Sequence, residues 1–209
     1  MELDLQAFSK LVKLVGMESE FHPLLEKIIP AAEDLVARDH FSFENLCHAV
    51  DLPLKGVVEA IGSMDDLVAH LNARFMATYT AKAFLIDAHN ADDLPALSAL
   101  SAAWLEHALS QPQRMNLLLQ HAWGESYVRP DWYLAKVKSC FSPVELRLSR
   151  LAPSAPADVV SGIARGIYAH VCGLYFLSTN ERAKPAGIDS LRKLLDLHLL
   201  TLVKGLQAR

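Results

Sequence analysis

Apolar residues recur three and four positions apart along almost the whole chain, and this spacing constrains the fold more than any other feature. Such spacing places the apolar side chains on one face of an α-helix, whereas a half-buried strand requires strict alternation. Sustained alternation is absent, as are the Asn-Gly and Asp-Gly pairs of tight hairpins. The sequence therefore predicts an all-α protein. Its 209 residues, 52% of them hydrophobic, are enough for one large domain or for a small domain fused to a medium one.

The cysteines and the chain start bear on the cellular compartment. The three cysteines are far apart and form no CxxC pair: Cys47, Cys140 and Cys172. This usage is typical of reduced thiols in the cytosol. The first four residues include two acidic ones, Glu2 and Asp4, where a secretory signal is basic. The longest strongly apolar stretch, residues 167–177, contains His170 and is too short to span a bilayer. We expect a cytoplasmic protein with no membrane partner.

The first third of the chain predicts short helices. Apolar residues at helical spacing predict an extra helix within residues 1–20, ending at Gly16: Leu5, Phe8, Leu11, Val12 and Val15. A second helix is expected from His22 to Arg38, kinked or divided at Pro30. Two still shorter helices are expected next, one capped by Ser42 and the other starting at Pro53.

A long helix is expected directly after these short ones. Ser63, with Asp66 three residues on, forms a capping-box-like start for it. Two short helices joined by a tight turn and followed by a long helix are the order of a helix-turn-helix module.

Residues 42–68, SFENLCHAVDLPLKGVVEAIGSMDDLV, resemble the helix-turn-helix of the TetR family of bacterial regulators. Ser42 matches the capping Thr of that pattern, Leu46 and Cys47 match its Ile-Ala pair, and Ile61 and Ser63 match its Phe and Ser. The stretches around Trp104 and Gly173 resemble later helices of the family. The resemblance implies a three-helix DNA-binding module over residues 21–66 and a helical ligand-binding and dimerisation domain over residues 67–209.

The resemblance also implies operator DNA as a partner. The residues expected to contact it are Ser42, Leu54, Lys55 and Ser63. The sequence departs from the family at the positions that commonly hold phosphates, where it has Val58 and Met64 in place of Tyr and Lys. Asp51 replaces the turn Gly, Pro53 the Ser after it, and Glu59 adds a carboxylate.

The charge of this region is unfavourable for DNA. Residues 21–75 contain four basic and nine acidic side chains, a net charge of −5. Asp65 and Asp66 are expected to lie near the phosphates and repel them. We therefore predict weak DNA binding with a shallow salt dependence. The alternative is a module that has kept the fold and lost the DNA.

The rest of the chain predicts five further helices, over residues 97–110, 113–123, 131–151 with a break near Pro143, 158–178 and 188–207. The middle helices contain large amphipathic side chains, which suit a small-molecule pocket between helices. In the family the corresponding helices enclose an inducer. The residues expected to line such a pocket for a small apolar ligand are Tyr79, Trp104, His107, Leu118, His121 and Trp132. Ordinary core packing is the alternative, since Trp and Tyr also fill cores.

The last two helices predict a homodimer. Small residues share one stripe of the first of them: Gly162, Gly166, Ala169 and Gly173. The second helix has a wide leucine face that includes Leu191, Leu195, Leu199 and Leu202. We expect these two helices to form a four-helix interface with a second copy. A larger intramolecular core is the alternative.

Signals of catalysis and metal binding are absent from the sequence. No two of the nine histidines have the i, i+4 spacing of a helical zinc pair. There is no GxSxG elbow and no glycine-rich phosphate loop. We expect no enzyme, metal or cofactor. The leading hypothesis is a ligand-responsive transcriptional regulator, and the alternative is a TetR-fold module that binds a small molecule, a lipid or a protein.

Overall fold

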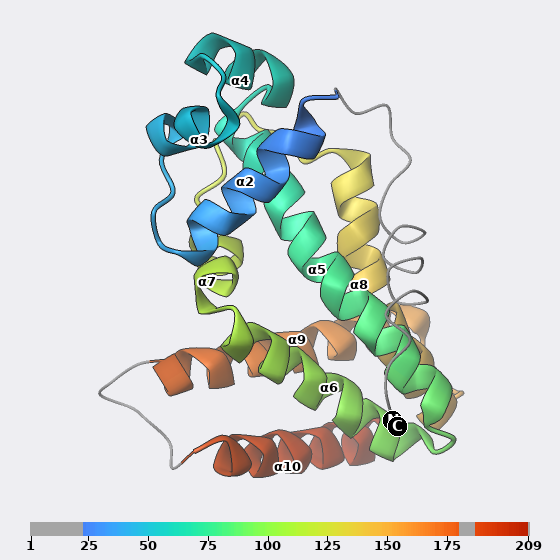
Figure 1. Cartoon of the computed structure of the whole chain (residues 1–209). Helices are drawn as coiled ribbons and strands as arrows, with labels where there is room; N and C mark the ends of the chain where they lie inside the picture. The colour runs from blue at the N-terminus through green and yellow to red at the C-terminus, as the bar shows by residue number, and fades with distance from the viewer. Residues whose placement is uncertain (1–22, 180–186, 209) are drawn as a thin grey trace. The chain divides into compact units, whose positions relative to one another are not determined.

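The computed structural model describes residues 23–179 and 187–208, and all regular structure in these two ranges is helical (Figure 1). The prediction of an all-α protein is confirmed. The extra helix predicted within residues 1–20 lies outside the described residues. The helices are α2 (Leu25–Ala37), α3 (Phe43–Val50), α4 (Leu54–Ile61), α5 (Met64–His89), α6 (Asp93–Ser110), α7 (Pro112–Gln120), α8 (Asp131–Leu151), α9 (Ala157–Thr179) and α10 (Ile188–Gln207).

The chain forms two compact units. Of the described residues, the first takes in those up to Thr78 together with Gln111–Val137, and the second takes in Tyr79–Ser110 together with those from Lys138 onward. The predicted domain boundary between residues 66 and 67 therefore falls inside the first unit. The reason is that Leu67 and Leu71, on the first turns of α5, are buried in the same core as the helices before them.

The core of the first unit joins α2, α3, α4 and the start of α5. Its buried apolar residues come from all four helices: Leu25, Ile28, Ile29, Ala32, Val36, Leu46, Val50, Val57, Ile61, Leu67 and Leu71. Full burial of each large apolar side chain contributes roughly 1.5–3 kcal/mol. Pro30 lies inside α2 and does not divide it, which rules out one of the two predicted alternatives, a division of the helix there.

The turns that end α2 and α3 have the same hydrogen-bond pattern. The backbone of Asp51 is in the left-handed conformation, with φ of 51°. Its N–H donates to the carbonyl of His48 at 3.3 Å. The N–H of Leu52 donates to the carbonyl of Cys47 at 3.1 Å. Asp39, with φ of 59°, ends α2 in the same way. Both are Schellman turns with aspartate where glycine is usual. The turn between α3 and α4 thus forms without the expected glycine.

The second unit is built around α6, α9 and α10, which pack on one another. The C-terminal part of α5 and most of α8 complete it. Helix α8 runs through Pro143 without the predicted break. Helix α6 begins at Asp93, earlier than expected, and α7 ends at Gln120, also earlier than expected.

Helix α9 extends one residue beyond the expected range 158–178 at each end. By length and composition alone it could cross a membrane, and it is the one described helix of which this is true. Val160, Ala164, Ile167 and Val171 on this helix are buried inside the second unit. A core helix passes the same test of length and composition.

Candidate functional site

Helix α4 exposes a mixed surface at the position predicted to meet DNA. Leu54 at its N-terminal end is 55% exposed, and Val58 one turn on is also exposed. The ammonium of Lys55 lies 3.7 Å from the carboxylate of Glu59 on the same helix. Because both side chains are largely exposed, this ion pair is weak, and a phosphate can compete for the lysine.

The two serines predicted to contact DNA are helix caps. The Ser42 hydroxyl accepts a hydrogen bond from the Asn45 N–H at 3.0 Å, as its N-terminal position predicted. The Ser63 hydroxyl accepts from the Asp66 N–H at 3.1 Å and donates to the Asp66 carboxylate at 2.6 Å. The proton of Ser63 is therefore already donated within the chain, and Ser42 is the better phosphate donor of the two.

A hydrogen-bonded cluster, which we call the carboxylate clamp, joins the start of α5 to the segment after α7. The Asp65 carboxylate lies 2.6 Å from the Nε2 of His121 and accepts from the Gly124 N–H at 3.2 Å. The Asp66 carboxylate accepts from the Tyr127 hydroxyl at 2.9 Å. Burial and the bond to Asp66 raise the pKa of Tyr127.

The clamp contains three residues that the sequence singled out. Asp65 and Asp66 are half-buried and bound to residues 121–127, but hydrogen bonds from a hydroxyl and an amide do not cancel a carboxylate's charge, so their repulsion of phosphates stays a prediction. His121, predicted to line a pocket, is bound to Asp65. Sequence reasoning missed the clamp because its two halves are 56 residues apart.

Stacked rings surround the clamp. Trp123 stacks on Tyr127 with ring centroids 5.4 Å apart and planes within 10°. Trp132, another predicted pocket residue, stacks on His70 at 4.7 Å. Burial lowers the pKa of His70, with Asp66 opposing the shift, so that ring favours its neutral form. Leu118, also predicted for the pocket, is half-buried in the same unit.

An open groove of about 480 Å³ lies between α3 and the N-terminal end of α4. We call it the α3–α4 groove, and its lining residues are Phe43, Glu44, Cys47, His48, Asp51, Leu52, Pro53 and Leu54. Cys47 and Leu52 are half-buried here. Two carboxylates, those of Glu44 and Asp51, stand exposed on its rim.

The second unit contains a small cavity of about 20 Å³. Its lining includes two of the predicted pocket residues, and the full set is Tyr79, Ser101, Trp104, Cys140, Phe141, Val144, Ala164, Ile167, Tyr168 and Val171. The third predicted residue of this unit, His107, is in ring contact with Trp104 and Tyr79 and is not part of the lining. A void of this volume holds about one water molecule, whereas ligand pockets usually measure roughly 300–1,000 Å³.

The cavity is uncharged. Burial raises the pKa of Cys140 to about 12 and raises that of Tyr79 well above its usual value. Both groups are therefore protonated at neutral pH. The Tyr79 hydroxyl donates to the carbonyl of Leu100 at 3.2 Å. The rings of Tyr79 and Trp104 are in a T-shaped contact, with their centroids 4.5 Å apart. Such a lining suits a neutral apolar molecule, provided that the rings repack to admit it.

The predicted dimer residues divide into two groups. The small-residue stripe of α9 is exposed along its whole length, and a methyl group added at Gly162, Gly166 or Gly173 would meet open space. On α10, Leu191, Leu195 and Leu199 are buried inside their own unit, which corrects their assignment to an interface, and Leu202 is half-buried. The exposed leucines of α10 are Leu194, Leu197 and Leu200.

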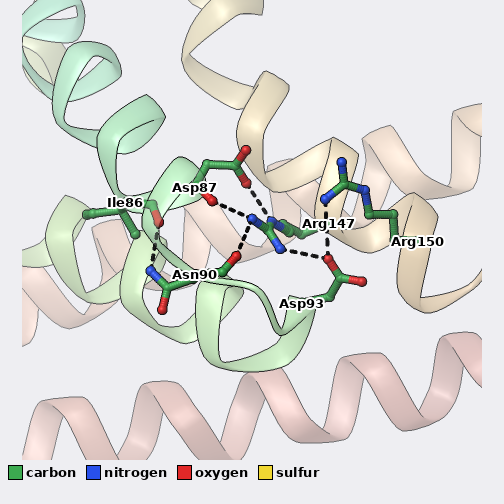
Figure 2. A network of polar contacts seen from close by, with 6 residues as sticks. All are labelled: Ile86, Asp87, Asn90, Asp93, Arg147 and Arg150. Carbon is green, nitrogen blue, oxygen red and sulfur yellow. Dashed lines mark hydrogen bonds and ion pairs between the residues drawn. The ribbon is translucent and has the colours of Figure 1, made fainter.

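A buried arginine on α8, Arg147, binds the connection between α5 and α6 in the second unit (Figure 2). The guanidinium of Arg147 donates to the carboxylates of Asp87 at 2.5 Å and Asp93 at 2.9 Å. It also donates to the backbone carbonyls of Asp87 and Asn90. The hydrogen bonds that Asp87 and Asp93 accept from Arg147 raise the pKa of its guanidinium despite its burial. Nothing in the local sequence pattern around residues 90–93 pointed to an arginine so far along the chain.

Two histidines stack between α9 and α10. The rings of His170 and His198 lie 3.9 Å apart and within 11° of parallel. Burial lowers the pKa of His170, and the neighbouring His198 lowers it further. Within residues 23–179 and 187–208, no three His, Cys, Asp or Glu side chains form a group that could hold a metal ion.

No protein-family model matches this chain, and no curated protein matches it either. Among solved structures, a protein of unknown function from Rhodococcus sp. RHA1 is similar, with a TM-score of 0.68 and 16% identity. The match covers 90% of this chain and 98% of that one. At this identity the likeness shows the fold alone, and it extends over both units.

Proposed function

We propose that this chain is a cytoplasmic transcriptional regulator of TetR-like architecture that docks α4 on duplex DNA as a homodimer. The observation that carries the proposal is the exposed N-terminal end of α4. Leu54 and Lys55 point outward there, and the turn before them forms without glycine. The N-terminal end of a recognition helix is the part that reaches base edges in the major groove.

The second unit supplies the proposed regulation and dimerisation. A small apolar molecule would enter between Tyr79, Trp104 and Phe141, because the lining there is neutral and already surrounds a void. The exposed stripe of α9, with Leu194, Leu197 and Leu200 of α10, is the proposed contact with a second copy. Small residues in line allow close helix approach, and exposed leucines supply apolar area.

A second candidate is a binding module that no longer contacts DNA. The pairing of Lys55 with Glu59 and the carboxylates on the rim of the α3–α4 groove favour it. Both features lower the attraction for phosphates, which dominates the affinity of most DNA-binding proteins.

The two candidates are separated by selection from a random pool of DNA duplexes at low salt. A regulator enriches two-fold symmetric duplexes with half-sites about one helical turn apart. Leu54→Ala should then relax the preferred half-site, whereas Gln113→Ala, an exposed change on α7, should not. Recovery of no preferred duplex at the lowest salt would reject DNA binding and leave the binding module.

A further inference from the structure

The α3–α4 groove has the chemistry of a binding site for an apolar segment. Phe43, Cys47, Leu52 and Leu54 give it apolar walls, and its volume of about 480 Å³ lies within the usual range of ligand sites. The exposed carboxylates on its rim repel phosphate and favour a partner that carries positive charge. A groove of this kind accepts an amphipathic helix through side chains at positions i, i+3 and i+4.

The chain itself contains a segment with this pattern. Residues 5–16, LQAFSKLVKLVG, place Leu5, Phe8, Leu11 and Val15 on one helical face and carry two lysines and no carboxylate. They lie outside the described residues. The described part starts at Pro23, just before α2, and α2 packs in the same core as α3 and α4.

The connection is long enough for this segment to reach the groove. Residues 17–22 span up to about 20 Å when extended, which is about the length of the 13-residue α2. A short tether also gives the segment an effective concentration on the order of 1 mM at the groove. A weak intrinsic affinity is therefore sufficient for docking.

We propose that residues 5–16 of this chain dock in its own α3–α4 groove and cover the N-terminal end of α4. Apolar side chains of the segment enter between Phe43, Cys47 and Leu54, and the lysines offset the carboxylates of Glu44 and Asp51. The docked segment shields the surface proposed to meet DNA. Docking itself needs no DNA, so it holds or fails independently of the function proposed above.

Cys47 provides a direct measurement, because it is the half-exposed thiol of the groove while Cys140 and Cys172 are buried. The full chain is labelled with N-ethylmaleimide, an uncharged reagent, and the rate at each cysteine is followed by mass spectrometry. The test variant is Phe8→Ser with Leu11→Ser. The matched control is Gln6→Ser, which changes the opposite side of the same segment.

The expected result is faster labelling of Cys47 in the double variant than in the unchanged chain and the Gln6→Ser control. If the segment binds with a dissociation constant of about 0.1 mM, its release raises the labelling rate about tenfold. A synthetic peptide of residues 1–22 should restore protection to the double variant. The rates at Cys140 and Cys172 report unfolding and should stay unchanged.

Two outcomes would overturn the proposal. In the first, Cys47 is labelled at the same rate in the unchanged chain and the double variant. In the second, protection of Cys47 in the unchanged chain grows as the protein concentration rises from about 1 to 100 µM, which would show that a second copy covers the groove.

Discussion

Two polar clusters bind together parts of the chain that are far apart in sequence, and their basic side chains, Arg147 and His121, differ in burial. Arg147 in the second unit is 3% exposed and donates four hydrogen bonds. In the carboxylate clamp of the first unit, His121 and Asp65 are 15% and 19% exposed. A buried charge must keep its partners, whereas groups at the surface can exchange theirs for water. We therefore expect the second unit to be a fixed scaffold and the clamp to be the part able to rearrange.

Arg147→Met is expected to have the largest effect of any change considered. It leaves Asp87 and Asp93 without their buried partner, and removal of one member of such a network costs about 3–5 kcal/mol of unfolding free energy. Urea unfolding measures the loss. Arg150→Gln is the control, because Arg150 is 51% exposed and 3.7 Å from Asp93, and should cost less than about 1 kcal/mol. Equal losses for the two variants would contradict the scaffold assignment.

The clamp should tolerate substitution better. Tyr127→Phe removes its hydrogen bond to Asp66 and should cost about 1 kcal/mol, because water can replace the lost donor at this half-exposed site. Amide exchange of residues 121–127 should quicken while exchange in the second unit stays unchanged. Ser126→Ala, an exposed neighbour, serves as the control. A loss as large as that of Arg147→Met would remove the contrast between the clusters.

Asp51, one of the two left-handed aspartates of the first unit, gives an effect of opposite sign. Asp51 has φ of 51°, which glycine adopts more readily, so Asp51→Gly should raise the unfolding free energy by up to about 1 kcal/mol. Glu44→Gln removes a carboxylate from the same groove without changing the turn, and should leave the stability within about 0.5 kcal/mol. If the glycine variant is less stable than the unchanged chain, the Asp51 side chain makes a contact that outweighs its backbone strain.

A smaller effect concerns pH, and each unit contributes one histidine to it. Burial lowers the folded-state pKa of His70 and His170 below 6.5, so the unfolded chain binds more protons as the pH falls below that value. The stability that these two neutral rings contribute is therefore fully present above pH 6.5 and is lost as the pH falls toward their lowered pKa values. His170→Gln should make the unfolding free energy, measured by urea unfolding, fall less steeply between about pH 7 and 5. The part of the fall that His70 causes should remain. An unchanged slope would show that the His170 ring is solvated.

The sequence predicted the helices because their apolar spacing is local. It also predicted the caps at Ser42 and Ser63, since each cap lies three residues from the amide that it accepts from. It placed Leu191, Leu195 and Leu199 at an interface because a leucine face does not reveal whether its own unit or a second copy covers it. The clamp and the Arg147 network were missed because their partners are 54 to 61 residues apart and share no local pattern.

The most direct test of the proposed regulator is the salt dependence of DNA binding when charge is restored to the α4 surface. Glu59→Gln frees Lys55 from its ion pair. Met64→Lys adds a cation at an exposed position where the TetR family, which the sequence resembles, commonly has a lysine. The control is Glu26→Gln, an exposed change on α2 with the same loss of negative charge as Glu59→Gln. We predict weak binding with a shallow salt slope for the unchanged chain. The double variant should bind more tightly. Its log–log slope should be steeper by about 1.8 for the two lysines added per dimer, and by up to about 1.8 more for the two Lys55 side chains that Glu59→Gln frees. Absence of binding by the double variant at low salt, or tight binding with a steep slope in the unchanged chain, would contradict it.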